Sequence, residues 1–165
     1  MKFSTHLKIT PSATVVINTL ALQKKLAGER VYNLSAGEPK INTSEIVKQA
    51  AIKAMQENKV NYYPPVAGLP ELRTEVVNWF NANYNAVYKQ ENVLVTTGGK
   101  MGLYLLLQLL LAHGDEVIIF SPYWVSYPSL VELFFGVPKI VQINEESGWK
   151  VSLADLEAAY SSKTK

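Results

Sequence analysis

Thr96-Thr97-Gly98-Gly99-Lys100 is the stretch that decides the predicted fold, because it joins a short apolar segment to a long apolar run. Residues 92–96 are rich in β-branched side chains and predict a buried parallel strand. Residues 101–112 are rich in leucine and predict a helix, which ends at His113-Gly114-Asp115. A strand, a glycine turn and a helix in succession are typical of an α/β fold.

The glycine pair in this turn can be interpreted in two ways. Glycines at a tight strand-to-helix turn often serve backbone geometry alone. They also leave amide N–H groups uncovered at the start of a helix, where the helix dipole favours an anion such as a phosphate. The turn fits neither the P-loop pattern GxxxxGKS/T nor the dinucleotide pattern GxGxxG. We expect a phosphorylated ligand at the carboxyl end of a parallel strand, with a plain turn as the alternative.

The composition excludes several classes of protein. The chain has 165 residues, of which 48% are hydrophobic and 18% charged, and this predicts a globular protein. A net charge of +2 gives no reason to expect nucleic acid or an anionic membrane as a partner. Cysteine is absent and the two histidines, His6 and His113, are far apart in sequence, so we expect no metal site. No secretory signal or membrane span is evident, which favours a cytoplasmic protein.

Hydrophobic periodicity and turn residues predict the other elements. Helices are expected over residues 13–27, 43–58, 70–84, 101–112, 126–135 and 152–160, and strands over residues 31–34, 92–96, 116–120 and 139–143. Pro70 is expected in the first turn of its helix, Ser152 is expected to cap the last helix, and Thr43 or Ser44 is expected to cap the helix over residues 43–58. Strands that alternate with helices predict a mainly parallel sheet.

Four motifs follow one another along the chain. They are Ser35-Ala36-Gly37-Glu38-Pro39, Tyr63-Pro64-Pro65-Val66-Ala67-Gly68-Leu69-Pro70-Glu71-Leu72-Arg73, Thr97-Gly98-Gly99-Lys100 and Ser121-Pro122-Tyr123-Trp124-Val125-Ser126-Tyr127-Pro128. With them the chain resembles the N-terminal part of a class I aminotransferase of the fold-type I pyridoxal-phosphate enzymes, and most of all the bacterial aspartate aminotransferases. The resemblance implies a partial fold-type I fold, with an N-terminal arm and part of a small domain over residues 1–42 and the first part of the large domain over residues 43–165.

The resemblance also implies which residues hold pyridoxal 5′-phosphate. Gly98, Gly99 and Lys100 correspond to the phosphate loop, in which backbone N–H groups are the main donors. Tyr63 corresponds to a tyrosine that reaches into the neighbouring subunit's site and hydrogen-bonds the cofactor phosphate, which implies a homodimer. Trp124 corresponds to a tryptophan that stacks on the pyridine ring and helps to hold the substrate carboxylate. From the residues alone, Tyr63 could instead pack in its proline-rich loop and Trp124 in the core.

The same resemblance implies contacts with an amino acid and a 2-oxo acid as substrates. Gly37 corresponds to a glycine whose backbone N–H meets the substrate α-carboxylate, although a plain turn glycine is the alternative. Thr14 and the Lys100 side chain correspond to groups that meet a distal carboxylate. An ammonium group suits the side chain of aspartate or glutamate, whereas a solvated lysine at a helix start is the alternative.

Other groups of the family's active site have no counterpart in these residues. The resemblance implies that the Schiff-base lysine and the binding arginines belong to segments after residue 165, and neither Arg30 nor Arg73 matches them. We therefore expect no catalytic residue here, and a fragment of an aminotransferase that is inactive alone. Two alternatives stay open: a non-catalytic protein that binds a phosphorylated ligand or pairs with an aminotransferase subunit, and a nucleotide-binding α/β module.

Overall fold

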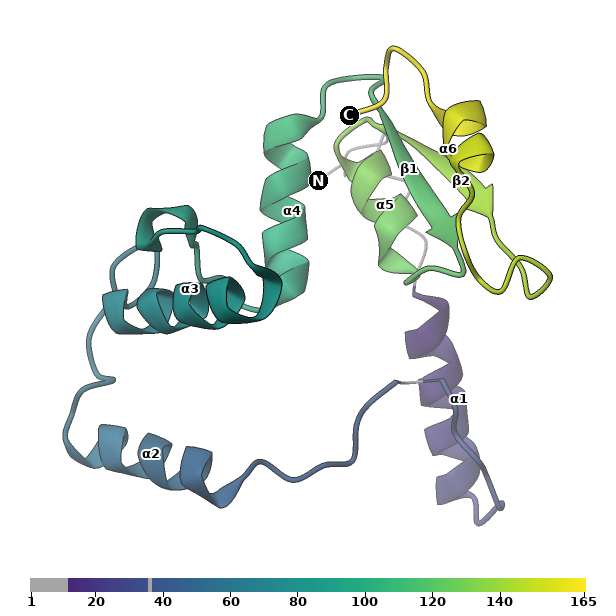
Figure 1. The fold of residues 1–165 in the computed structure, drawn as a ribbon. Coiled ribbons are helices and arrows are strands. Elements are labelled where there is room, and N and C mark those ends of the chain that lie inside the picture. The colour runs from purple at the N-terminus through teal and green to yellow at the C-terminus, as the bar shows by residue number, and fades with distance from the viewer. Residues whose placement is uncertain (1–11, 36) are drawn as a thin grey trace, which may run out of the picture. The chain divides into compact units, whose positions relative to one another are not determined.

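The structure is a computed structural model that describes residues 12–35 and 37–165 (Figure 1). The chain divides into two compact units. One comprises Glu38–Gly102, and the other comprises the described residues up to Gly37 together with Leu103–Lys165. The predicted N-terminal arm before residue 12 lies outside the described residues. The two units are described separately below.

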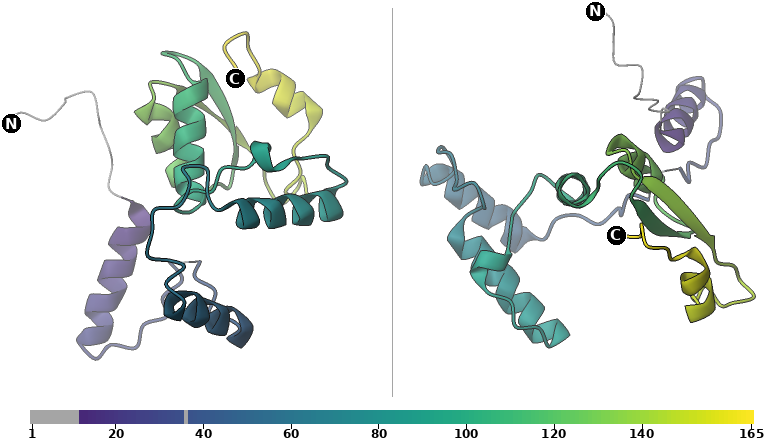
Figure 2. Two further views of the ribbon diagram at one scale, coloured as in Figure 1. Left: turned by 90° about the vertical axis from the view of Figure 1, so that its left-hand side faces the viewer. Right: turned by 90° about the horizontal axis from the view of Figure 1, so that it is seen from above.

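A pair of parallel strands forms the centre of the second unit. Strand β1 (Glu116–Ser121) pairs with β2 (Val137–Gln142), with Glu116 opposite Val137. Helix α5 (Ser126–Leu133) connects them and packs on both, while α6 (Leu153–Ala159) packs on β2. Figures 1 and 2 show α5 and α6 on opposite sides of the strands. This strand–helix–strand arrangement confirms the parallel pairing predicted from the sequence.

The core of the described residues is small. The buried hydrophobic side chains are Ile119 of β1, Val131 of α5 and Val141 of β2. A Cβ at Gly136 would lie 2.8 Å from Cγ1 of Val131 and 3.0 Å from Cδ1 of Leu111. Glycine at this position therefore lets the chain turn closely against Val131 on its way from α5 to β2.

The last residues of the chain meet the other edge of β1. The Glu116 N–H donates to the Lys163 carbonyl at 2.8 Å, and the Lys165 N–H donates to the Glu116 carbonyl at 2.9 Å. The Ser161 hydroxyl donates to the Glu116 carboxylate at 2.6 Å. In a strand, the main-chain N–H and C=O groups of successive residues point to opposite edges. The Asp115 carbonyl accepts a hydrogen bond from the Val137 N–H of β2, so the main-chain groups of Glu116 point to the edge away from β2.

The Glu38–Gly102 unit is built from helices and extended segments. Helix α2 (Glu45–Gln56) is followed by a loop over residues 61–68 and by α3 (Pro70–Tyr84), with Pro70 in its first turn as predicted. A short 3₁₀ helix, η1 (Gln90–Asn92), then leads to residues 93–96 and to the start of α4 (Gly99–Leu110). The remaining helix, α1 (Ala13–Leu26), belongs to the other unit.

Two strands predicted from the sequence are wrong. Residues 92–96 end η1 and then run without pairing in a sheet, and residues 31–34 form no strand either. The described sheet contains β1 and β2 alone, so neither apolar segment has a strand beside it. Instead, the Val95 N–H donates to the Ala67 carbonyl of a loop at 3.0 Å. A strand requires a neighbouring strand, which local sequence does not supply.

Two predicted caps have different outcomes. Ser152 precedes α6 and accepts a hydrogen bond from the Asp155 N–H at 3.0 Å, while the Ser152 N–H donates to the Asp155 carboxylate, so this cap is confirmed. Ser44 precedes α2, but its side chain makes no capping hydrogen bond. The predicted helix over residues 43–58 is correspondingly shorter, because α2 runs from Glu45 to Gln56.

Candidate functional site

The turn before α4 holds the predicted phosphate loop. Gly98 has φ +85°, a conformation that favours glycine, and its N–H donates to the Thr96 carbonyl at 2.8 Å. The Thr96 hydroxyl donates to the Gly98 carbonyl at 2.9 Å. Both hydrogen bonds join residues of the turn itself and stabilise the reversal of the chain there. We call residues 96–99 the glycine turn. It brings the chain from the extended residues 93–96 directly into the first turn of α4.

The glycine turn is open to a ligand. A Cβ placed on Gly98 or Gly99 would have no atom within 4 Å, and both residues are exposed. The first N–H groups of an α-helix have no acceptor inside the helix, and they carry the positive end of its dipole. An anion can therefore approach the start of α4 without meeting a side chain from Gly98 or Gly99. Lys100, in the first turn of the helix, is also exposed and adds a positive charge.

Tyr63 lies in the same compact unit as the glycine turn. Its side chain is fully exposed, at 103% of the reference area, so it does not pack within the described chain. The loop that follows closes at Gly68, whose N–H donates to the Pro65 carbonyl at 2.8 Å. A tyrosine projecting from such a closed, proline-containing loop is available to a group outside its own fold.

Trp124 lies in the other unit, in the loop between β1 and α5. Its side chain is 41% exposed, and its ring meets the Tyr127 ring edge to face, with centroids 5.5 Å apart and planes at 88°. The Tyr127 N–H donates to the Trp124 carbonyl at 3.0 Å, which ties the loop to the first turn of α5. This exposure differs from the alternative in which Trp124 is a core aromatic of the described chain.

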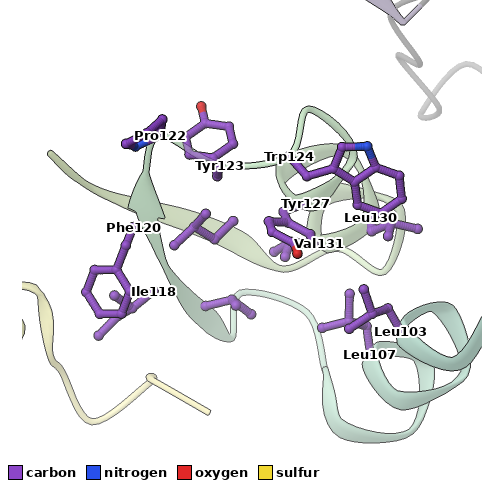
Figure 3. Close-up of a pocket in the computed structure, with 12 residues that line it drawn as sticks. Leu103, Leu107, Ile118, Phe120, Pro122, Tyr123, Trp124, Tyr127, Leu130 and Val131 are labelled. Carbon is purple, nitrogen blue, oxygen red and sulfur yellow. The ribbon is translucent and has the colours of Figure 1, made fainter. Parts of the chain in front are cut away.

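A cavity of about 570 Å³ adjoins Trp124 (Figure 3). Its walls come from α4, β1, α5 and the loop after β1, and its lining residues are Leu103, Leu107, Val117, Ile118, Ile119, Phe120, Pro122, Tyr123, Trp124, Tyr127, Leu130 and Val131. Figure 3 shows Trp124 near Tyr127 and Leu130, with Leu103 and Leu107 of α4 below them. An apolar, aromatic rim of this kind suits a flat ring rather than a charged group.

Thr14 and Gly37, both predicted to contact a substrate, belong to the same unit as Trp124. Thr14 is half-buried in the first turn of α1. Gly37 is exposed, and a Cβ there would have no atom within 4 Å. The structure therefore groups Tyr63, the two turn glycines and Lys100 in one unit, and places Thr14, Gly37 and Trp124 in the other.

Sequence reasoning missed the supports of the glycine turn. Gly68 has φ +100° and is buried, and a Cβ on it would lie 2.6 Å from Cβ of Val95. Arg73 donates from Nε to the Val93 carbonyl at 2.9 Å and from Nη2 to the Gln90 carbonyl at 2.6 Å. Both residues occur in the quoted motif that begins at Tyr63. That motif signalled their presence, but no local pattern indicated which segment they would contact.

Searches for other kinds of site give negative results for the described residues. Within residues 12–35 and 37–165, no group of three histidine, cysteine, aspartate or glutamate side chains could hold a metal ion. No helix in the described part of the chain is long and apolar enough to cross a membrane. Two features of the described residues that suit a ligand are the glycine turn and the aromatic cavity.

Known proteins resemble this chain over almost all of its length. The family described as aminotransferase class I and II matches residues 29–165. The aspartate aminotransferase of Geobacillus stearothermophilus is 44% identical over 157 residues, which are 95% of this chain and 40% of that protein. A probable aspartate/prephenate aminotransferase of Aquifex aeolicus is 38% identical over 97% of this chain and 40% of that protein.

Solved structures give the same result. The structure described as aspartate aminotransferase from Thermus thermophilus with maleate has a TM-score of 0.94 and 38% sequence identity, and the match covers 100% of this chain and 43% of that chain. The present chain thus spans about 40% of the length of the curated relatives it matches.

Proposed function

The chain belongs to the aminotransferase class I and II family and has the fold of the N-terminal part of an aspartate aminotransferase; from this we propose that it provides binding groups for pyridoxal 5′-phosphate in an enzyme that transfers an amino group between aspartate and a 2-oxo acid. The observation that carries the proposal is the open glycine turn at the start of α4, within the stretch matched by the family.

The glycine turn fits the phosphate of the cofactor. Gly98 and Gly99 present no side chain, so phosphate oxygens can reach the amide N–H groups at the start of α4. The helix dipole favours the negative charge there, and Lys100 adds a cation beside it. In this proposal the turn holds one end of the cofactor and resists its loss during turnover.

Trp124 fits the ring of the cofactor. It is an exposed aromatic residue on an apolar rim, and its contact with Tyr127 restrains the orientation of its ring. Stacking on such a platform would orient a flat pyridine ring and exclude water from one face. When bound, pyridoxal phosphate supplies an electron sink for the amino-acid carbanion, while the protein supplies binding and orientation.

The proposed substrate contacts come from Gly37, Thr14 and Lys100, together with Trp124, which would help to hold the substrate carboxylate. Gly37 would donate its backbone N–H to the α-carboxylate, and the open space around it permits this approach. Thr14 and Lys100 would meet a second carboxylate at the far end of the substrate. Because a lysine ammonium pairs well with a carboxylate, this arrangement favours aspartate over a substrate with an apolar side chain.

Assembly and location are part of the proposal. The fully exposed Tyr63 supports a homodimer in which this tyrosine meets the cofactor phosphate of the partner subunit. A cytoplasmic enzyme of amino-acid metabolism, without nucleic acid or membrane as a partner, is the setting we propose. The division into a small-domain segment over residues 1–42 and a large-domain segment over residues 43–165 also stays a prediction.

Ligand titration of the full-length protein tests the cofactor. Pyridoxal phosphate should bind and perturb tryptophan fluorescence, because Trp124 would lie against its ring. A nucleotide such as ADP should not compete. Tight ADP binding without pyridoxal phosphate binding would instead support a nucleotide-binding module.

Steady-state kinetics of the full-length protein test the substrate. Lys100→Gln should raise KM for aspartate more than for alanine, because only aspartate carries the distal carboxylate. Lys53→Gln is the matched control, since Lys53 is an exposed lysine of α2 in the same unit. Equal effects of Lys100→Gln on both amino acids would contradict the assignment of Lys100 to the distal carboxylate.

A further inference from the structure

The glycine turn is held by residues that do not belong to it. Residues 93–96, which lead into the turn, are held by contacts with α3 and with the loop over residues 61–68. Three contacts do this: a main-chain hydrogen bond, a close approach at a glycine, and a pair of bonds from an arginine. All lie within the Glu38–Gly102 unit.

The first two contacts join the turn segment to the loop that carries Tyr63. The Val95 N–H donates to the Ala67 carbonyl at 3.0 Å. Next to it, Gly68 lies so close that a Cβ would be 2.6 Å from both Cβ and Cγ2 of Val95. Real Cβ atoms are not found at that distance, and the positive φ of Gly68 adds strain for any other residue. Only glycine allows this contact without displacing Val95.

The third contact comes from α3. Arg73 Nε donates to the Val93 carbonyl and Nη2 to the Gln90 carbonyl, at 2.9 and 2.6 Å. Because the guanidinium is planar and binds two carbonyls of the same segment, it fixes the direction of that segment as well as its distance from α3. Farther along the segment, the Asn81 side chain bonds the Tyr88 main chain in both directions, at 3.0 and 2.9 Å. Residues 88–93 are thus held along α3 before the chain reaches the glycine turn.

We propose that Gly68 and Arg73 are positioning residues for the phosphate of the cofactor: they touch no ligand, but they set where the glycine turn presents its amides. This rests on the function proposed above. Phosphate recognition by amide N–H groups depends on their direction, because hydrogen bonds weaken steeply as they bend. A displacement of residues 93–96 would move the start of α4 and misdirect these donors.

The test compares two ligands that differ only in the phosphate. Dissociation constants for pyridoxal phosphate and for pyridoxal are measured by fluorescence titration on the full-length protein, and their ratio reports the contribution of the phosphate. In Gly68→Ala and Arg73→Gln the ratio should fall about tenfold or more, since an error of about 1 Å in position can cost a large factor. Arg73→Lys keeps a donor group, the ammonium, in place of the guanidinium. It should therefore restore part of the ratio that Arg73→Gln loses.

Matched controls separate positioning from a general loss of stability. Gly114→Ala introduces the same strain, since Gly114 has φ +84°, but its Cβ would meet no atom within 4 Å. Arg30→Gln removes the other of the two arginines, which lies over the Tyr32 ring at 5.1 Å. Both controls should keep the wild-type ratio. Partial unfolding lowers the folded fraction for both ligands alike, so it does not change the ratio.

Each outcome decides between the two proposals. A wild-type protein that prefers pyridoxal phosphate, with variants at Gly68 and Arg73 that keep this preference, overturns the positioning role and leaves the proposed function intact. A wild-type protein that binds both ligands equally overturns the proposed phosphate site and the positioning role with it. If Gly68→Ala does not fold, Arg73→Gln and its rescue by Arg73→Lys decide the question.

Discussion

Two apolar segments of this molecule have similar compositions, but they adopt different structures. Residues 92–96 and Glu116–Ser121 are both rich in β-branched side chains, and both were predicted as strands. Glu116–Ser121 pairs with β2 along its length and contributes buried Ile119. In the other segment Leu94 is 55% exposed, and Val95 bonds a loop carbonyl. The difference teaches that a β-branched run is only a candidate strand until another strand lies beside it.

The largest expected effect concerns activity, because the two units are proposed to contribute binding groups alone. A polypeptide limited to these 165 residues should show no measurable transfer of an amino group from aspartate to 2-oxoglutarate, even with pyridoxal phosphate added. The reason is that the resemblance implies a Schiff-base lysine outside these residues, and the covalent step requires that lysine. Steady turnover by this polypeptide, proportional to its concentration, would contradict the prediction.

The next effect separates the packed strands from the exposed loops. Val131→Ala should destabilise the protein by about 2 kcal/mol, because Val131 is only 1% exposed and its lost methyl groups leave a cavity. The same substitution at Val66, which is 99% exposed, should change stability by less than about 0.5 kcal/mol. Urea denaturation measures both. Equal effects at the two valines would mean that the core is not where β1, β2 and α5 meet.

Trp124, which follows the paired strand β1, gives the next effect. In the full-length protein, Trp124→Ala should lower turnover about tenfold or more, because cofactor and substrate would be less well oriented. Its thermal midpoint should stay near that of the wild type, since the ring is 41% exposed. An unfolded variant whose remaining folded fraction has normal kinetics would support a core role instead. Tyr32→Ala, at a 73% exposed aromatic residue, is a control.

The two helix caps provide a smaller comparison. Ser152→Ala should cost about 1 kcal/mol of stability, because its side chain accepts from the Asp155 N–H at the start of α6. Ser44→Ala should cost only a few tenths, about 0.3 kcal/mol, because the Ser44 side chain makes no capping bond to α2. The difference in urea midpoint between the two variants measures this. A larger loss at Ser44 would show that α2 is capped in solution.

The smallest effect is a pH dependence in the sheet unit. The hydrogen bond from the Ser161 hydroxyl lowers the pKa of the Glu116 carboxyl below its ordinary value of 4.5, and Lys139, 3.5 Å away, contributes in the same direction. Because the folded pKa lies below the unfolded one, the stabilisation is fully present above about pH 4.5 and disappears as pH falls through the folded value.

Glu116→Gln should therefore be less stable than the wild type at neutral pH, and the two should converge in acid. Thermal midpoints measured from neutral pH down to about pH 3 test this. Glu146→Gln, in the exposed turn after β2, is the control and should follow the wild type at every pH. A constant difference between Glu116→Gln and the wild type across the range would show that the carboxylate charge is not what matters.

Sequence reasoning succeeded where the interactions are local. Helix α3 begins at Pro70 as predicted, because proline is pre-organised for the first turn and lacks the N–H that would have no partner there. Ser152 caps α6 through a bond to a residue three positions away. The site residues follow the same rule, since Gly98 takes the left-handed conformation expected of a glycine turn.

Sequence reasoning failed where a partner comes from far along the chain. The predicted strands over residues 31–34 and 92–96 have the right composition, but among the residues that the structure describes no strand lies beside them. Arg73 was set aside because it matched no binding arginine, yet it holds carbonyls 17 and 20 residues later in the chain. Gly68 occurred in a quoted motif, but its contact with Val95 spans 27 positions and leaves no local signal.

The sequence by itself determined the family, the helices with clear ends and the residue types of the candidate site. These depend on neighbouring residues, on helical hydrogen bonds four positions apart and on the allowed φ of glycine and proline. Only the tertiary structure decided which apolar segment became a strand, how far Tyr63 and Trp124 are exposed, and what supports the glycine turn. Those depend on hydrogen-bond partners and packing surfaces that the folded chain brings together from distant positions.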